Sequence, residues 1–188
     1  MGGGPAMSSL AANNQTLLEI LDRARAVGDL GPEPNDAVIS QALRFVGALP
    51  PSAHSIADLG SGAGVPGLII ALERTDIEVR LVERSQKRCD GLNVAARKLG
   101  VADRVSVWCG DARDVAKSAQ WSDVDAVVCR AFSPVEELFD AALPLLGKDG
   151  TLLVSEPPAS DGSRWKDKTP ASVNGPDVAD GIATFSLR

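Results

Sequence analysis

Apolar residues recur at helical spacing twice in the first third of the chain, and a polar break separates the two stretches. Residues 15–27 carry apolar side chains three and four positions apart, which predicts an amphipathic helix. A second helix is predicted from a cap at Asn35 or Asp36 to a pair of prolines that ends it. Residues 1–8 are rich in Gly and Ser and are expected to form a flexible tail.

From residue 55 onward, short apolar runs alternate with amphipathic stretches. Strands are predicted at 55–59, 78–82, 104–108, 124–129 and 150–155. Helices are predicted at 66–73, 85–99 and 136–146. Strands that alternate with helices indicate an α/β fold, in which a mostly parallel sheet is covered by helices on both faces.

The C-terminal part of the chain is less regular. Residues 156–181 are polar and rich in Pro, Gly, Ser and Asp, so we expect a loop with at most one short helix. Residues 182–187 alternate in polarity, which predicts a last strand that returns antiparallel to the sheet. We assign residues 1–34 to an N-terminal tail and helix, and residues 35–188 to one α/β domain.

The composition excludes several classes of protein. The chain has 188 residues, 44% of them hydrophobic, and a net charge of −6. No apolar run reaches the roughly 18 residues of a membrane span, and the N-terminus lacks the features of a secretory signal. We therefore expect a cytoplasmic protein that does not contact membranes. The negative charge argues against a broad basic face for nucleic acid.

Cysteine and histidine usage restricts the chemistry further. Cys89, Cys109 and Cys129 are odd in number and far apart in the sequence. We therefore expect free, buried thiols and no metal site. His54 is the only histidine, which weakens any catalytic scheme built on a Ser-His-Asp or Cys-His arrangement.

A glycine-rich run follows the first predicted strand. Gly60, Gly62, Gly64 and Gly67 lie within eight residues, directly after Asp58. Glycine permits positive φ and a close approach of ligand to backbone, so a strand, a glycine turn and a helix form a nucleotide-binding device. The G-x-G-x-x-G match alone favours no particular nucleotide, and a merely structural turn is the alternative. Asp58 would repel a pyrophosphate and suits a cationic ligand or the amides of the turn.

Acidic residues also end the next two predicted strands. Glu83 can accept both hydroxyls of a ribose, or it is a solvated surface charge. Asp111 can accept from an adenine amine while the amide of Ala112 or Arg113 meets a ring nitrogen, or it caps the following helix. Together with the glycine turn, this order resembles class I methyltransferases that use S-adenosyl-L-methionine, a cofactor without phosphate.

Three segments carry a more specific resemblance. They are 58–67 (DLGSGAGVPG), 81–87 (LVERSQK) and 129–132 (CRAF). In combination they resemble the GidB/RsmG family over residues 35–156. The resemblance implies a Rossmann-like class I fold with a seven-stranded type of sheet, complete or reduced at its C-terminal edge. It also implies an enzyme that methylates guanine N7 in small-subunit (16S) ribosomal RNA, so this RNA or the small ribosomal subunit is the expected partner.

The resemblance also assigns site residues. The family's contacts with the cofactor fall at Gly60, Val65, Ala112, Arg113 and Arg130. Arg130 would hold the cofactor carboxylate or orient the guanine and a phosphate, and a structural ion pair with Asp58 or another acid is the alternative. Guanine N7 has a free lone pair and attacks without deprotonation, so we assign positioning to Arg130 and expect neither a general base nor a metal.

The chain departs from the family pattern on the acceptor side. Residues 35–43 lack the family's histidine and Asp-Ser-Leu segment, and 156–158 (EPP) replaces a Lys-Gly pair, which predicts an acidic substrate mouth. Two alternatives therefore stay open. One is a methyltransferase for a small molecule or protein, with Phe132 or Trp165 as a lid; the other is a non-catalytic cofactor-binding paralogue. An NAD-dependent oxidoreductase is disfavoured by the acid before the glycine turn and by the absence of tyrosine.

Overall fold

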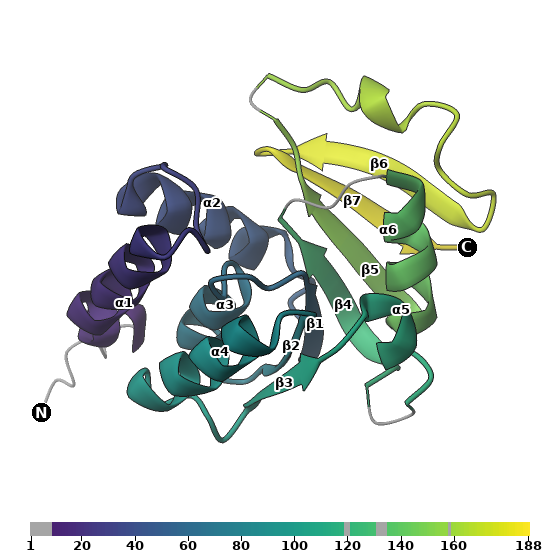
Figure 1. Cartoon of the computed structure of the whole chain (residues 1–188). Helices are drawn as coiled ribbons and strands as arrows, with labels where there is room; N and C mark the ends of the chain where they lie inside the picture. The colour runs from purple at the N-terminus through teal and green to yellow at the C-terminus, as the bar shows by residue number, and fades with distance from the viewer. Residues whose placement is uncertain (1–8, 119–120, 131–134, 158) are drawn as a thin grey trace, which may run out of the picture.

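The chain folds into a seven-stranded sheet between two helical layers (Figure 1). The computed structural model describes residues 9–118, 121–130, 135–157 and 159–188. The helices are α1 (Ser9–Ala26), α2 (Asn35–Ala48), α3 (Gly67–Glu73), α4 (Gln86–Lys98), α5 (Ala112–Val115), α6 (Val135–Ala142) and the 3-10 turns η1 (Leu143–Leu145) and η2 (Ser163–Trp165). The strands are β1 (Ser55–Leu59), β2 (Glu78–Glu83), β3 (Val105–Cys109), β4 (Val124–Cys129), β5 (Leu146–Ser155), β6 (Val173–Ala179) and β7 (Ile182–Leu187).

The strand order across the sheet is β3-β2-β1-β4-β5-β7-β6. Strands β1 to β5 pair in parallel, whereas β7 runs antiparallel to both β5 and β6. The order reverses between β1 and β4, so the connections that follow these two strands leave the sheet on opposite faces. The predicted α/β class with a mostly parallel sheet is confirmed, and the C-terminal edge of the sheet is complete.

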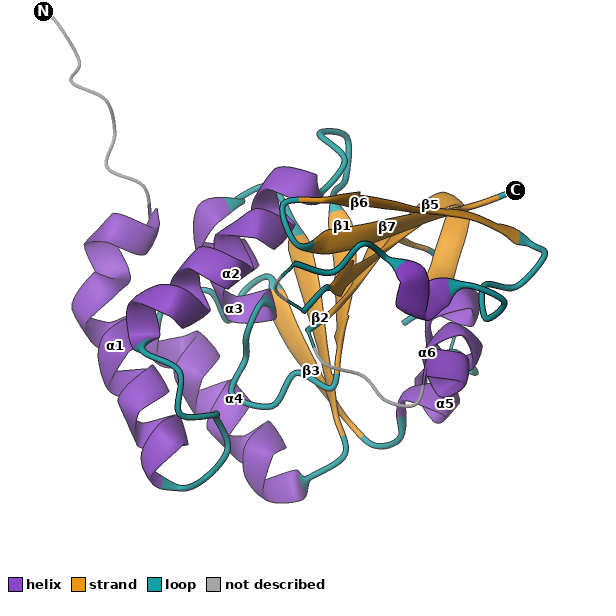
Figure 2. Cartoon of the chain, turned by 90° about the horizontal axis from the view of Figure 1, so that it is seen from above, coloured by secondary structure: helices purple, strands orange, loops and turns teal. Residues whose placement is uncertain are grey.

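Helices α1 to α4 cover one face of the sheet, and α5 and α6 cover the other (Figures 1 and 2). Successive side chains of each strand point to opposite faces of the sheet, so each strand contributes to the core on both faces. On β1, Ile56 packs into the core beneath α1 to α4, whereas Ala57 and Leu59 pack into the core on the opposite face. Central strands buried on both faces need continuous apolar runs, which is the pattern that the sequence shows.

The N-terminal helices differ from the prediction in their first residues. Helix α1 begins at Ser9 rather than at residue 15. Helix α2 begins at Asn35 after Pro34 in the N-cap position, so the predicted cap at Asn35 or Asp36 is wrong. Leu17 and Leu21 of α1 belong to the same core as α2 and α3. The domain boundary after residue 34 stays a prediction.

The C-terminal region differs more. Strand β5 begins at Leu146 rather than at residue 150, and its pairing with β4 contains a register shift. The stretch 156–181, expected to be a loop, contains both η2 and the whole of β6. Strand β6 is an edge strand with a register shift between Asn174 and Asp177, and most of its residues are not buried. An exposed edge strand needs no apolar alternation, so its sequence gave no strand signal.

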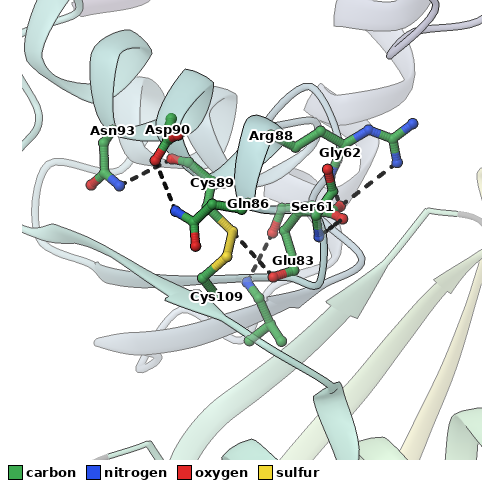
Figure 3. Close-up of a disulfide and its surroundings, with 11 residues drawn as sticks. Ser61, Gly62, Glu83, Gln86, Arg88, Cys89, Asp90, Asn93 and Cys109 are labelled. Carbon is green, nitrogen blue, oxygen red and sulfur yellow. Dashed lines mark hydrogen bonds and ion pairs between the residues drawn. A yellow bond between two sulfur atoms is a disulfide. The ribbon is translucent and has the colours of Figure 1, made fainter.

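A disulfide joins Cys89, in the first turn of α4, to Cys109 at the end of β3 (Figure 3). Their Cα atoms are 5.8 Å apart. The expectation of free thiols is wrong for this pair, whereas Cys129 is not part of the disulfide and is a buried thiol whose Sγ lies 3.5 Å from the Leu59 carbonyl oxygen. The pairing follows from topology, because β2 and β3 are neighbours and the helix after β2 starts beside the end of β3.

Within these described ranges, no group of three or more His, Cys, Asp or Glu side chains could hold a metal ion. None of the helices there combines the length and the apolar character that a membrane span requires.

Candidate active site

Four titratable residues lie in or just after the last positions of parallel strands, at the edge of the sheet formed by the carboxyl ends of these strands. Asp58 lies near the end of β1, Glu83 ends β2, Asp111 follows β3 and Arg130 follows β4. Ligands of Rossmann-like folds bind at this edge, beside the point where the strand order reverses. The order reverses here between β1 and β4, so we build the candidate site around their ends.

Asp58 is a buried carboxyl group. Its side chain is almost fully covered, and Oδ2 accepts a hydrogen bond from the Gly67 amide at 3.0 Å. Burial raises the pKa of Asp58 to about 7, against the opposing effects of the Gly67 amide and the charge of Arg130. No side chain forms an ion pair with Asp58 in the described part of the chain. A cation that binds nearby would therefore favour its ionised form.

Ser61 ties the glycine turn to the sheet. Its hydroxyl donates to the Asp58 carbonyl oxygen at 2.7 Å and accepts from the Val82 amide at 3.0 Å. The amides of Gly60 and Ser61 both donate to the Val82 carbonyl oxygen. Ser61 is absent from the predicted site residues, although a small polar side chain between two glycines was a signal for such a role.

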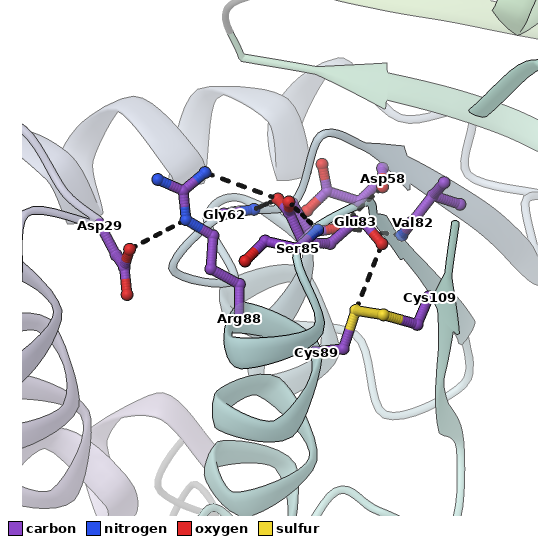
Figure 4. A network of polar contacts seen from close by, with 10 residues as sticks. Asp29, Asp58, Gly62, Val82, Glu83, Ser85, Arg88, Cys89 and Cys109 are labelled. Carbon is purple, nitrogen blue, oxygen red and sulfur yellow. Dashed lines mark hydrogen bonds and ion pairs between the residues drawn. A yellow bond between two sulfur atoms is a disulfide. The ribbon is translucent and has the colours of Figure 1, made fainter. Parts of the chain in front are cut away.

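Glu83 binds backbone amides of two segments, the glycine turn and the residues that precede α4 (Figure 4). Its Oε2 accepts from the Gly62 amide at 3.0 Å, and its Oε1 accepts from the Ser85 amide at 2.9 Å. Arg88 approaches Oε2 to 4.0 Å and donates from Nε to Asp29 at 2.9 Å. A carboxylate accepts about four hydrogen bonds, so each oxygen of Glu83 retains acceptor capacity. The prediction omitted Arg88, which links the connection between α1 and α2 to this carboxylate.

The glycine turn has an open half and a packed half. Gly60, Gly62 and Gly64 have φ of +70°, +54° and +88°, which is strained for any side chain. A Cβ at Gly60 would meet no atom within 4 Å, whereas a Cβ at Gly64 would lie 2.8 Å from Leu68 Cγ. The side chain of Val65 belongs to the core, so a ligand contact there would come from its backbone.

Asp111 caps α5. Its Oδ1 accepts from the Arg113 amide at 2.9 Å, and its Oδ2 lies 2.8 Å from the Arg113 guanidinium. The Arg113 side chain holds the pKa of Asp111 well below its usual range. The capping role is thus observed, while the contacts of Asp111, Ala112 and Arg113 with adenine stay predictions.

Arg130 is partly buried and directly follows β4. Its carbonyl oxygen accepts a hydrogen bond from the Ser155 hydroxyl, which joins the ends of β4 and β5. The alternative in which Arg130 pairs with Asp58 is not observed among the described residues. Phe132, one of the two predicted lid residues, lies outside the described part of the chain.

Glu156 is buried beside η2. Its Oε1 accepts from Trp165 Nε1 at 2.7 Å and from Arg164 Nε at 2.8 Å, and its Oε2 accepts from the Ser160 hydroxyl. The Arg164 guanidinium lies 4.2 Å from the centroid of the Trp165 ring. Glu156 therefore does not form the predicted acidic substrate mouth, because Arg164 balances its charge inside the fold. Trp165 is 1% exposed and is a core residue rather than a lid.

A cavity with a volume of about 850 Å³ runs between α1 and α4. Its walls include Ile20, Ala24, Leu92 and Ala95, and it touches the glycine turn at Gly62 and Ala63. Neither Asp58, Glu83, Asp111 nor Arg130 lines it. These four strand-end residues thus lie outside the cavity. We therefore place the candidate site at the carboxyl ends of the parallel strands and not in the cavity.

Solved structures with the same architecture define the class of the fold. An O-methyltransferase from Bacillus cereus, solved in complex with SAH, is similar with a TM-score of 0.67 and 17% identity, over 93% of this chain and 91% of that one. An RNA methyltransferase from Salinibacter ruber, in complex with S-adenosyl-L-homocysteine, gives a TM-score of 0.54 and 21% identity, over 84% and 92%. The predicted fold, that of Rossmann-like class I S-adenosyl-L-methionine-dependent methyltransferases, is confirmed.

The sequence comparisons give the family. The profile of the GidB family, described as rRNA small subunit methyltransferase G, matches residues 36–160, and this chain belongs to that family. The Ribosomal RNA small subunit methyltransferase G of Mycobacterium sp. (strain JLS) is 36% identical over 129 residues, covering 67% of this chain and 56% of that protein. Its namesake in Kineococcus radiotolerans is 40% identical over 109 residues, covering 58% and 42%. The chain thus spans about half the length of the curated relatives it matches.

Proposed function

We propose that this chain binds S-adenosyl-L-methionine and transfers its methyl group to N7 of a guanine in small-subunit (16S) ribosomal RNA. The observation that carries the proposal is the combination of two buried carboxylates, Asp58 and Glu83, with the open turn at Gly60 and Gly62. The family description and the names of the relatives support the acceptor. Ribosomal RNA or the small ribosomal subunit is the proposed partner, in the cytoplasm.

The residues at the sheet edge fit this cofactor. S-adenosyl-L-methionine carries a sulfonium, an ammonium, a carboxylate and two ribose hydroxyls, and no phosphate. Asp58 and Glu83 attract cations and repel a pyrophosphate, and the remaining acceptor capacity of Glu83 matches hydroxyl donors. Arg130 supplies a positive charge at the same edge. Asp111, Ala112 and Arg113 at the end of β3 are the proposed contacts for adenine.

The reaction needs positioning more than acid–base chemistry. The bound cofactor would supply an electrophilic methyl group on its sulfonium. Guanine N7 has a free lone pair, so no residue of this chain has to remove a proton. The chain has to hold donor and acceptor in line, with reacting atoms about 3–3.5 Å apart. Asp58 would balance the positive charge of the cofactor, and Arg130 would hold its carboxylate or orient the guanine and a phosphate.

Isothermal titration calorimetry with S-adenosyl-L-homocysteine and S-adenosyl-L-methionine tests the cofactor half of the proposal. We expect the chain to bind both and Asp58→Ala to abolish binding, because the charge that faces the cofactor is lost. Asp103→Ala, an exposed acid before β3, is the matched control and should bind normally. Circular dichroism establishes that each variant is folded. Binding of NAD without binding of either methionine-derived ligand would refute the proposed cofactor.

The acceptor is tested by deleting the gene and mapping N7-methylguanine in small-subunit ribosomal RNA. We expect one methylated guanine to be lost and to return with the wild-type gene but not with the Asp58→Ala gene. Purified small subunits from the deletion strain should then accept labelled methyl groups in vitro. If label instead enters a protein or small-molecule fraction of the extract, the acceptor is of that other class. Cofactor binding without label in any fraction would indicate a non-catalytic paralogue.

A further inference from the structure

We propose that the Cys89–Cys109 disulfide is a site of thiol–disulfide exchange that couples the affinity for the cofactor to the redox state of the chain. This inference rests on the proposed function, because it concerns the adenosine side of the same site. Neither cysteine belongs to the predicted cofactor contacts. Their bond joins two of the segments that carry those contacts, the one that contains Glu83 and the one that contains Asp111 (Figure 3).

The disulfide lies between the ends of β2 and β3. Glu83 at the end of β2 pairs in register with Cys109 at the end of β3. Cys89 lies six residues beyond Glu83, in the first turn of α4, and its Sγ is 3.2 Å from the Glu83 carbonyl oxygen (Figure 4). Asp111 follows Cys109 after a single glycine. The bond therefore fixes the segment that holds the proposed adenine contacts to the segment that holds the proposed ribose contact.

The two cysteines of the disulfide differ in their exposure to solvent. Cys109 is exposed to solvent, whereas Cys89 is 1% exposed. A reductant can therefore reach the bond only from the Cys109 side. Thiol–disulfide exchange needs this access, because a thiolate has to attack one sulfur along the axis of the bond.

The structure also accommodates the reduced chain. A disulfide sulfur carries no proton, so the approach of Cys89 Sγ to the Glu83 carbonyl oxygen is only a contact while the bond is intact. After reduction the Cys89 thiol gains a proton, and the same geometry becomes an S–H···O hydrogen bond. The Gly110 amide donates to the same carbonyl oxygen at 2.9 Å and can do so in both states. Reduction thus loosens the site without leaving a buried polar group unpaired.

The exchange reaction balances with a dithiol protein or a small dithiol as reductant. Its thiolate attacks Cys109 Sγ, the bond between the cysteines breaks, and Cys89 leaves as a thiolate that takes up a proton. The second thiol of the reductant then resolves the mixed disulfide. Two electrons and two protons pass to the chain, and the reductant becomes a disulfide. The first turn of α4 stabilises the leaving thiolate.

The proposed cytoplasmic setting agrees with such a role. Disulfides of cytosolic proteins are usually transient and catalytic or redox-sensing. In the oxidised chain, the segment after β3 is fixed in place. In the reduced chain that segment has to be ordered when the cofactor binds. We therefore expect the reduced chain to bind S-adenosyl-L-homocysteine at least about fivefold more weakly than the oxidised chain, an effect of the size usual for coupling between two sites.

The test compares the air-oxidised chain with the chain reduced by dithiothreitol. Alkylation under denaturing conditions should label one cysteine in the oxidised chain and all three in the reduced chain. Calorimetry should show tighter binding of S-adenosyl-L-homocysteine by the oxidised chain. Cys109→Ser changes the exposed partner, so it should bind like the reduced chain whether or not dithiothreitol is present. Cys129→Ser keeps the disulfide and should respond to dithiothreitol as the wild type does.

Three labelled cysteines in the air-oxidised chain, or equal affinity in both states, would overturn the inference. Absence of binding in both states would instead refute the proposed function. In that case, amide hydrogen exchange at residues 110–115 decides the redox inference. Faster exchange after reduction in the wild type, and no such change in Cys109→Ser, would support the coupling, and unchanged exchange would overturn it.

Discussion

Asp58 and Glu156 are buried carboxylic acids at the same edge of the sheet, and the fold treats them in opposite ways. Asp58, near the end of β1, accepts from a backbone amide and forms no ion pair with any described side chain. Glu156, just after β5, is held by Arg164, Trp165 and Ser160. The first acid has no ion-pair partner among the described side chains, whereas the second is paired with an arginine inside the fold. An acidic residue at a strand end therefore indicates a site only where its charge is not already neutralised.

The strongest test of this contrast removes the partner of Glu156. Arg164→Met leaves a carboxylate that is buried and without its cation, so we expect the free energy of unfolding to fall by about 3–5 kcal/mol. Denaturant titration measures the loss. Adding Glu156→Gln in the same chain should recover part of it. Affinity for S-adenosyl-L-homocysteine should change little in the folded double variant, and a large loss there would place Glu156 in the site after all.

The two halves of the glycine turn should respond differently to one added methyl group. In Gly67→Ala the new Cβ would lie 2.7 Å from Asp58 Oδ2 and would also collide with Leu81, so we expect a loss of about 1–3 kcal/mol in stability. In Gly60→Ala the Cβ meets nothing within 4 Å, and only backbone strain of about 1 kcal/mol remains.

Calorimetry should rank the same two variants by their effect on cofactor affinity. Gly60→Ala fills the open half of the turn, so we expect at least about tenfold weaker binding, equivalent to about 1.4 kcal/mol. Unchanged affinity in Gly60→Ala would show that the cofactor does not approach this glycine.

The pH dependence of the free energy of unfolding distinguishes a buried acid with a raised pKa, such as Asp58, from an acid that is ion-paired. Its pKa is about 7 in the folded chain against 3.8 when exposed, so the folded chain keeps a proton that the unfolded chain has lost between these values. The unfolding free energy should therefore fall as pH rises through this window, by at most about 1.4 kcal/mol per pH unit. Asp58→Asn should remove this slope while other groups titrate as before. An identical slope in both chains would contradict the raised pKa.

The smallest expected effect concerns the exposed acid at the end of β3. Asp111→Ala removes the cap of a helix of only four residues, so we expect a loss of less than about 1 kcal/mol in stability. Asp111→Asn keeps a capping oxygen and should be nearly neutral. If Asp111 also contacts adenine, both variants weaken cofactor binding; if it only caps α5, neither does, and calorimetry distinguishes the two cases.

The strand-end residues that we propose for the cofactor could be singled out from the sequence because their signals are local. The acid before the turn, the glycines and the acids at the next two strand ends all lie within or beside apolar strands. What the sequence could not show depends on contacts between distant segments. The Cys89–Cys109 bond requires that β2 and β3 be neighbours, and the ion pair between Glu156 and Arg164 requires that η2 fold back onto β5.

Strand β6 was not predicted because its residues are not typical of a strand, and the same residues make it a poor template for pairing with a further strand. It ends the sheet, and it carries Gly175, Pro176 and Asp177 at its register shift. Proline cannot donate a backbone hydrogen bond, and a charged residue beside it opposes a neighbouring strand. The last strand of the sheet is therefore a poor template for another copy of the chain, which protects this protein against aggregation through strand addition at that end.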